Sequence, residues 1–168
     1  FGSARQKFFT QIQLKAAELE ATLASVPDAY IIYDAKGRIV RMNPEAKRYF
    51  RYDEKTAGLP LEDRLRLMGH IFPEVDASNI TESPQHKALR GESPAIEIFS
   101  VQHPGAAECW LEMTTSPILG VDGKPAGAFA IFKDITEQRN YEQILQRYRV
   151  LFDEARDIIF LMKPDGNI

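Results

Sequence analysis

The sequence predicts an α+β fold, in which a five-stranded antiparallel sheet carries short helices on one face and is flanked by a helix at each end. The element order is the first observation: strand-like apolar runs occupy 29–42 and 96–135, and short helical segments lie between them. The run 128–132 is apolar on both faces, so both sides of that strand need a cover. Charged segments with helical periodicity at both ends complete the pattern.

Residues 4–26 contain no Gly or Pro and read as one helix that ends at Pro27. Apolar side chains recur in it at spacings of three and four, namely Phe9, Ile12, Ala16, Leu19, Leu23 and Val26. This a/d pattern is typical of a coiled coil and predicts a homodimer. An amphipathic helix packed on its own domain explains the stripe equally well.

Residues 28–42 predict a β-hairpin that turns at 34–37. Asn43 and Pro44 then provide a helix start, with Asn as the N-cap and Pro at the first helical position. Further short helices are expected at Pro60–Met68 and at 83–91. Residues 70–79 show no period, and no element is predicted there.

Two strands, Trp110–Ser116 and Ala126–Ile135, flank a turn at Asp122-Gly123. Pro117 is expected to end the first of them because it cannot donate to a ladder. Alternation puts Leu111 and Met113 on one face of this strand. The outer face of the second strand needs a cover, which is a further reason to expect a dimer.

After Thr136 the chain predicts a connector helix with an apolar stripe at Tyr141, Leu145, Tyr148, Phe152 and Ala155. Residues 157–168 then echo residues 28–39, with Asp, Gly and Ile at matching positions. A repeat of this kind predicts tandem domains joined by a helix, the second cut after its first strand and turn. The sequence starts without Met, so we expect a piece of a longer chain.

The run from Trp110 through Asp134-Ile135-Thr136 resembles the last hairpin of a PAS domain, a sensory module of bacterial signalling proteins. Residues 29–50 and 83–92 resemble earlier parts of the same family, and the likeness covers roughly 23–139. The expected organisation is an N-terminal helix at 1–26, a PAS domain at 27–136, a connector helix at 137–156 and the start of a second repeat at 157–168.

The resemblance implies a set of side chains that face a ligand pocket: Ile31, Tyr33, Ile98, Leu111, Met113, Ala130 and Phe132. The alternative is that these residues simply fill a core. The resemblance also implies that Asp134 and Thr136 couple the sheet to the output helix, with Ile135 anchoring the opposite side. Thr136 is expected to cap that helix.

Composition and motifs argue against several classes of function. A net charge of −3 argues against a nucleic-acid surface, and no apolar run is long enough to span a bilayer. No nucleophile elbow, phosphate loop, zinc helix or paired Cys ligands occur, so an enzyme is not expected. Cys109 begins a strand, not the helix used by flavin photosensors, and His86 is too close to Gly91-Glu92 for haem.

The expected function is a cytoplasmic sensory and dimerisation module of a sensor histidine kinase, relaying a packing change to an output domain in the same chain. A haem- or flavin-bearing sensor, and a module of a diguanylate cyclase or transcriptional regulator, remain alternatives. No haem or flavin, no metal, no nucleic acid and no membrane contact within this segment are expected. An unknown small-molecule ligand and an upstream membrane anchor are compatible with the sequence.

Overall fold

The computed structural model describes residues 2–68, 81–92 and 95–154. The chain separates into two compact units, residues 1–134 and 135–168. The first holds the sheet and all helices but the last, and the second holds the last helix.

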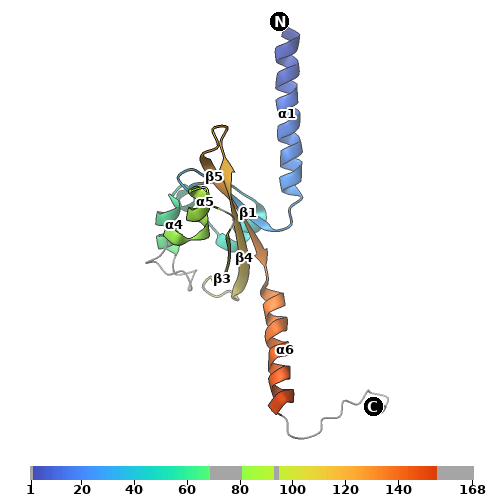
Figure 1. Cartoon of the computed structure of the whole chain (residues 1–168), viewed down its shortest axis with the longest axis vertical. Coiled ribbons are helices and arrows are strands. Elements are labelled where there is room, and N and C mark those ends of the chain that lie inside the picture. Colours follow the sequence, from blue (N-terminus) through green and yellow to red (C-terminus); the bar gives the residue numbers. More distant parts are fainter. Residues whose placement is uncertain (1, 69–80, 93–94, 155–168) are drawn as a thin grey trace, which may run out of the picture. The chain divides into compact units, whose positions relative to one another are not determined.

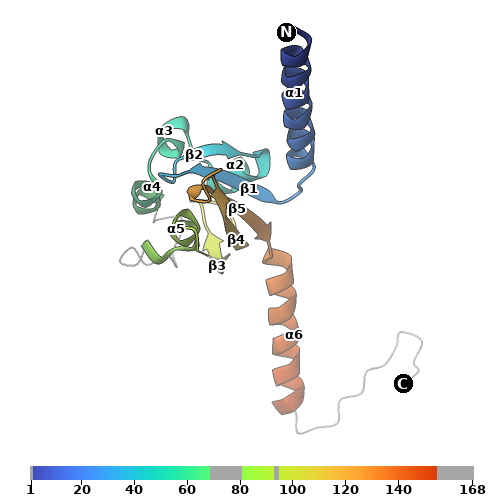
Figure 2. The ribbon, with the colours of Figure 1, turned by 45° about the horizontal axis from the view of Figure 1, so that its top comes forward.

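A single five-stranded sheet lies within the first unit (Figure 1), in the order β2-β1-β5-β4-β3 (Figure 2). Every pairing in it is antiparallel. The strands are β1 (Ala29–Asp34), β2 (Ile39–Met42), β3 (Ala95–Val101), β4 (Cys109–Leu119) and β5 (Pro125–Asp134). The predicted sheet is confirmed, and the strand that is apolar on both faces, β5, lies at its centre.

Within the described residues, four short helices lie between β2 and β3 in the chain: α2 (Pro44–Phe50), α3 (Glu54–Ala57), α4 (Leu61–Met68) and α5 (Pro84–Leu89). Helix α2 contacts β1, and α5 contacts β3, β4 and β5. Figure 2 shows α4 and α5 on the same side of the sheet. Helix α3 was not predicted from the sequence, and its N-cap Asp53 accepts a hydrogen bond from the Thr56 N–H at 2.7 Å.

Asn43 confirms its expected role and adds a second one. Its Oδ1 accepts from the Ala46 N–H at 3.1 Å, which caps α2. The same oxygen accepts from the Tyr30 N–H at 2.9 Å, and Asn43 Nδ2 donates to the Asp28 carbonyl. The cap therefore also fastens β1 to the start of α2, and α2 is held at a fixed place beside the sheet.

Pro117 does not end β4, contrary to expectation, because the strand continues to Leu119. The register explains why. Strand β3 begins at Ala95, opposite Thr115, so the described part of β3 does not extend beside Ser116 or Pro117. Within the described residues, β5 is the one strand that pairs with β4 at this point, and a proline is tolerated where a strand has no partner on one side.

Helix α1 (Gly2–Ala24) exposes most of the apolar stripe on which the dimer prediction rests. Phe9, Ile12 and Leu19 each leave at least half of their surface open to solvent. An ion pair joins Arg41 of β2 to Glu20 at 2.7 Å, and such exposed pairs contribute little to stability. The alternative was that the apolar stripe of α1 packs on its own domain. That packing does not explain these three side chains, because they remain exposed.

Helix α6 (Thr136–Glu154) forms the described part of the second unit. Its predicted stripe is exposed at Tyr141, Leu145, Tyr148 and Phe152. Ala155 and the repeat at 157–168 lie outside the described residues.

Candidate sensory core and output junction

Six of the seven residues expected to line a pocket lie on the helix-covered face of the sheet and belong to its core: Ile31, Tyr33, Leu111, Met113, Ala130 and Phe132. None of them is more than 4% exposed. The register sets them in neighbouring rows, with Phe132 between Ala29 and Met113, and Ala130 between Ile31 and Thr115. Their inward orientation follows from the alternation read in the sequence, and their contact with a ligand stays a prediction.

Ile98 was wrongly assigned to this set. It is 43% exposed, whereas its neighbour Phe99 is 6% exposed and belongs to the core. Phe99 pairs with the inward Leu111, and Ile98 pairs with Glu112 on the opposite face. Strand β3 carries apolar residues on both faces, so its sequence alone does not reveal which set points inward.

Aromatic rings connect α2 to the sheet. The Phe50 ring meets the Phe132 ring edge-on at 4.7 Å between centroids, and Phe132 in turn meets Phe99 at 6.2 Å. On its other side Phe50 stacks on Tyr52 at 5.5 Å with an interplanar angle of 10°. Contacts of this kind add about 0.5–1.5 kcal/mol each beyond area burial, so the last turn of α2 is firmly packed.

Arg64 of α4 is a buried cation that the sequence analysis missed. It is 1% exposed, and its guanidinium lies over the rings of Tyr33 and Tyr52 at 5.3 and 5.7 Å. It donates to the carbonyls of Leu59 and Gly37 at 2.9 Å each. The side chain thereby ties α4 to the β1–β2 turn through groups that carry no negative charge.

The two tyrosines beside Arg64 titrate far from their ordinary range. Burial raises the pKa of Tyr33 to about 12, although the Arg64 cation and its hydrogen bond act in the opposite direction. Burial also raises the pKa of Tyr52, and again Arg64 offsets part of the rise. Both phenols are therefore neutral hydrogen-bonding groups at physiological pH.

Helix α5 places polar groups against β4. Gln85 is 8% exposed, and its Nε2 donates to the Met113 sulfur at 3.0 Å. Thr115 Oγ1 donates to the Pro84 carbonyl at 3.0 Å. A thioether is a weak acceptor, so the Gln85 amide is a core group whose donor would gain from a better partner.

Three chain segments meet at Asp134, the last residue of β5. Its Oδ2 accepts a hydrogen bond from the Tyr49 hydroxyl at 2.9 Å and another from the Cys109 thiol at 3.3 Å. Tyr49 belongs to α2 and Cys109 begins β4, so the carboxylate fastens both to the end of β5. Sequence reasoning picked out Asp134 but missed Tyr49, which lies 85 residues away in the chain.

Tyr49 is held by further groups. Arg48 donates to its hydroxyl at 3.2 Å, and His103 Nε2 lies 2.7 Å from its carbonyl oxygen. Partial burial and the bond to Asp134 raise the pKa of the Tyr49 phenol, while the Arg48 bond lowers it. The residue that follows α2's last turn, Arg51, has φ of 51°, a left-handed conformation uncommon for a side-chain-bearing residue.

The start of α6 differs by one residue from the expectation. The first helical backbone bond runs from the Arg139 N–H to the Ile135 carbonyl at 2.9 Å, which places Ile135 at the N-cap position. Thr136 is the first residue of the helix, so it does not occupy the capping position assigned to it. The coupling role of Asp134, Ile135 and Thr136 stays a prediction.

Two side chains bear on haem and flavin chemistry. His86 lies in the first turn of α5 with its Nδ1 2.9 Å from Ser83 Oγ, the N-cap oxygen. Cys109 lies on a strand, where its thiol donates to Asp134 at the end of β5. The expectation of no haem and no flavin stays a prediction.

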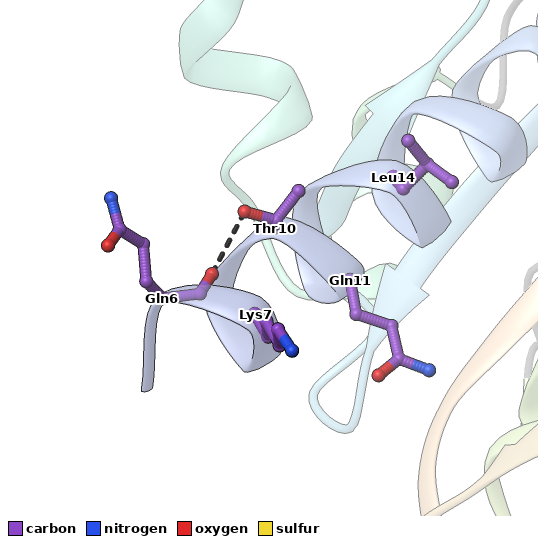
Figure 3. Close-up of a pocket in the computed structure, with 5 residues that line it drawn as sticks. All are labelled: Gln6, Lys7, Thr10, Gln11 and Leu14. Carbon is purple, nitrogen blue, oxygen red and sulfur yellow. Dashed lines mark hydrogen bonds between the residues drawn. The ribbon is translucent and has the colours of Figure 1, made fainter. Parts of the chain in front are cut away.

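A shallow depression on α1 is lined by Gln6, Lys7, Thr10, Gln11 and Leu14 (Figure 3). All five are exposed side chains of a single helix, so the feature is helix surface and not an enclosed site. Within the described residues, no three His, Cys, Asp or Glu side chains come together as a metal site would require. In the same residues, no helix has the length and apolar character needed to cross a bilayer.

Comparison with known proteins agrees with this architecture. A family model described as the PAS fold matches residues 23–140. The alginate biosynthesis sensor protein KinB of Pseudomonas aeruginosa is 29% identical over 132 residues, which are 77% of this chain. The chain spans 20% of the length of that relative.

Two solved structures illustrate the fold. The PAS domain of an HTR-like protein from Haloarcula marismortui is 19% identical with a TM-score of 0.53, and the match covers 77% of this chain and 99% of that domain. A PAS domain from Colwellia psychrerythraea is 24% identical with a TM-score of 0.52, covering 71% of this chain and 98% of its own. At these identities the likeness concerns the fold alone.

Proposed function

Because this chain belongs to the PAS family, we propose that it is the sensory and dimerisation module of a larger sensor histidine kinase. The observation that carries the proposal is the likeness to a bacterial sensor protein over most of this chain. In this proposal the core receives the signal and the flanking helices pass a packing change to an output domain in the same chain. The module itself does no chemistry.

The exposed apolar stripes support dimerisation. Phe9, Ile12 and Leu19 on α1, and Tyr141 and Tyr148 on α6, are too exposed to be part of a monomer's core. Each stripe keeps the three-and-four spacing of a helix that pairs with a copy of itself. A homodimer would remove both stripes from water, and the outer face of β5 would gain a cover.

The core supports recognition of a small organic ligand. Ala128 and Ala130 are small, fully buried residues at the middle of the sheet, and they belong to its apolar core. Gln85 offers an amide donor whose present acceptor is only the Met113 sulfur. We propose a mostly apolar ligand with one hydrogen-bond acceptor, and no resident haem or flavin.

Native mass spectrometry of the purified chain tests the dimer. We expect twice the mass of 19.1 kDa, and monomers or poor solubility after removal of residues 1–22. A truncated protein that stays fully dimeric and equally stable contradicts the role of α1. The matched control is Arg41→Ala, which removes the exposed pair with Glu20 and is expected to leave the mass unchanged.

An absorption spectrum of the same sample tests the cofactor part. The proposal expects no band above the aromatic absorption. A haem band that disappears in His86→Ala, or a flavin band retained through purification, would replace the proposed ligand class. Kinase activity of the longer protein, in place of nucleotide cyclisation or DNA binding, tests the output.

A further inference from the structure

The last turn of α2 belongs to two groups of contacts at once. Phe50 packs in the core, between the rings of Phe132 and Tyr52. Its neighbour Tyr49 donates its hydroxyl hydrogen to Asp134 Oδ2. Helix α2 therefore contacts both the candidate ligand core and Asp134, the last residue of β5.

Contacts at both of its ends hold α2 together as one rigid unit. Asn43 holds its start against β1, and His103 contacts the Tyr49 carbonyl at its end. The inner side of α2 is buried, since Ala46 is 0% and Phe50 2% exposed. A shift of the Phe50 ring therefore shifts Tyr49 as well, because the two residues share one rigid turn.

Tyr49 is bound to Asp134 by a polar contact at the surface. A hydrogen bond to a carboxylate is directional and stronger than a neutral one, but here it is open to solvent and can be exchanged for water. Such a bond resists small displacements and breaks under larger ones. It therefore suits a contact whose state depends on how the core is packed.

We propose that Tyr49 is a positioning residue that couples packing around Phe50 to the end of β5 through its hydrogen bond to Asp134. This inference rests on the proposed sensory function and names its route. The alternative route is β5 itself, since Phe132 and Asp134 lie on the same strand. The two routes make different predictions for a pair of substitutions.

Hydrogen exchange of the full chain distinguishes them. Phe50→Leu loosens the core contact, and Tyr49→Phe removes only the hydroxyl. We measure exchange in peptides that contain residues 133–139 and, as an internal reference, residues 29–34. If Tyr49 carries the coupling, Phe50→Leu accelerates exchange at 133–139 in both backgrounds, and the acceleration factor is at least about threefold larger with Tyr49 present than in the Tyr49→Phe background. The reference peptide responds equally in both.

Equal acceleration in the two backgrounds overturns the proposal and assigns the coupling to β5. Tyr30→Phe is the matched control, because Tyr30 is a tyrosine of the same domain whose ring meets that of Phe129 at a tilt, whereas the hydroxyl bonded to Asp134 is that of Tyr49. Combining it with Phe50→Leu should leave the acceleration unchanged. If Phe50→Leu fails to fold, Phe50→Met probes the same contact with less loss of volume.

This experiment uses neither a ligand nor an output domain. Suppose that Phe50→Leu and Tyr49→Phe are non-additive in exchange, but the output of the longer protein does not depend on this module. That result would refute the proposed function and leave the coupling intact. An additive result together with normal signalling would refute the coupling and leave the function intact.

Discussion

Two polar clusters of this domain differ in their exposure to solvent. Between α4 and the β1–β2 turn, Arg64 is buried against Tyr33 and donates to the Gly37 carbonyl away from solvent. At the end of β5, Asp134 accepts hydrogen bonds from Tyr49 and Cys109 that solvent can reach. A buried polar group is costly to separate from its partners, whereas an exposed one exchanges them for water. We therefore expect the first cluster to contribute more to the stability of the fold, and the second to exchange its partners more readily.

Removing the buried cation should have the largest effect. Arg64→Met keeps much of the side-chain length but leaves the Leu59 and Gly37 carbonyls without their donor. We expect a loss of about 3 kcal/mol in the free energy of unfolding, measured by urea denaturation. Arg66→Met is the matched control on the exposed side of α4, where only a surface pair to Glu62 is lost. Equal stabilities of the two variants would show that the Arg64 cluster holds nothing in place.

The tyrosines of the same cluster should make the fold sensitive to alkali. The folded pKa of Tyr33 is about 12, above the ordinary value of 10, so folding favours the neutral phenol. Its contribution is fully present below pH 10 and is lost as pH rises towards 12, by about 1.4 kcal/mol per pH unit. Denaturation at pH 9, 10 and 11 measures the slope. Tyr33→Phe should be less stable at pH 9 and should fall less steeply, and an unchanged slope contradicts the assignment.

The junction should respond weakly by comparison. Cys109→Ala removes one donor to Asp134 while the Tyr49 hydroxyl remains. Thiols are weak donors, so the unfolding free energy should change by less than about 1 kcal/mol. Thermal unfolding of this variant beside Arg64→Met gives the comparison directly. A loss as large as that of Arg64→Met would mean that the junction is as structural as the core.

The sequence predicted the sheet well, because alternation and turn residues are local signals. Leu111 and Met113 lie inside as their spacing indicated, and Asn43 caps α2 as expected. Ile98 failed because β3 is apolar on both faces, so only the pairing of Phe99 with Leu111 decides its orientation. Pro117 failed because a proline ends a strand only where a neighbouring strand needs its missing N–H, and the pairing of β4 is not a local signal of the sequence.

Arg64 and Tyr49 were missed for different reasons. Arg64 lies on the same side of α4 as the buried Leu61 and Leu65, and that spacing was an available signal. Its charge argued for solvent, since arginine is seldom fully buried without partners, and those partners come from the backbone. Tyr49 meets Asp134 across 85 residues, a contact that no local pattern encodes.

The most direct test of the coupling at Asp134 compares the output of the longer protein with the stability of this chain for one substitution. Asp134→Ala removes the acceptor at the junction, and we predict altered output of the longer protein with its output domain present. In this chain the same change should cost no more than about 1–2 kcal/mol of unfolding free energy, because the Tyr49 and Cys109 donors turn to water. Normal output, measured as autophosphorylation beside the unsubstituted protein, would contradict the coupling and leave Asp134 as a local contact of the sheet.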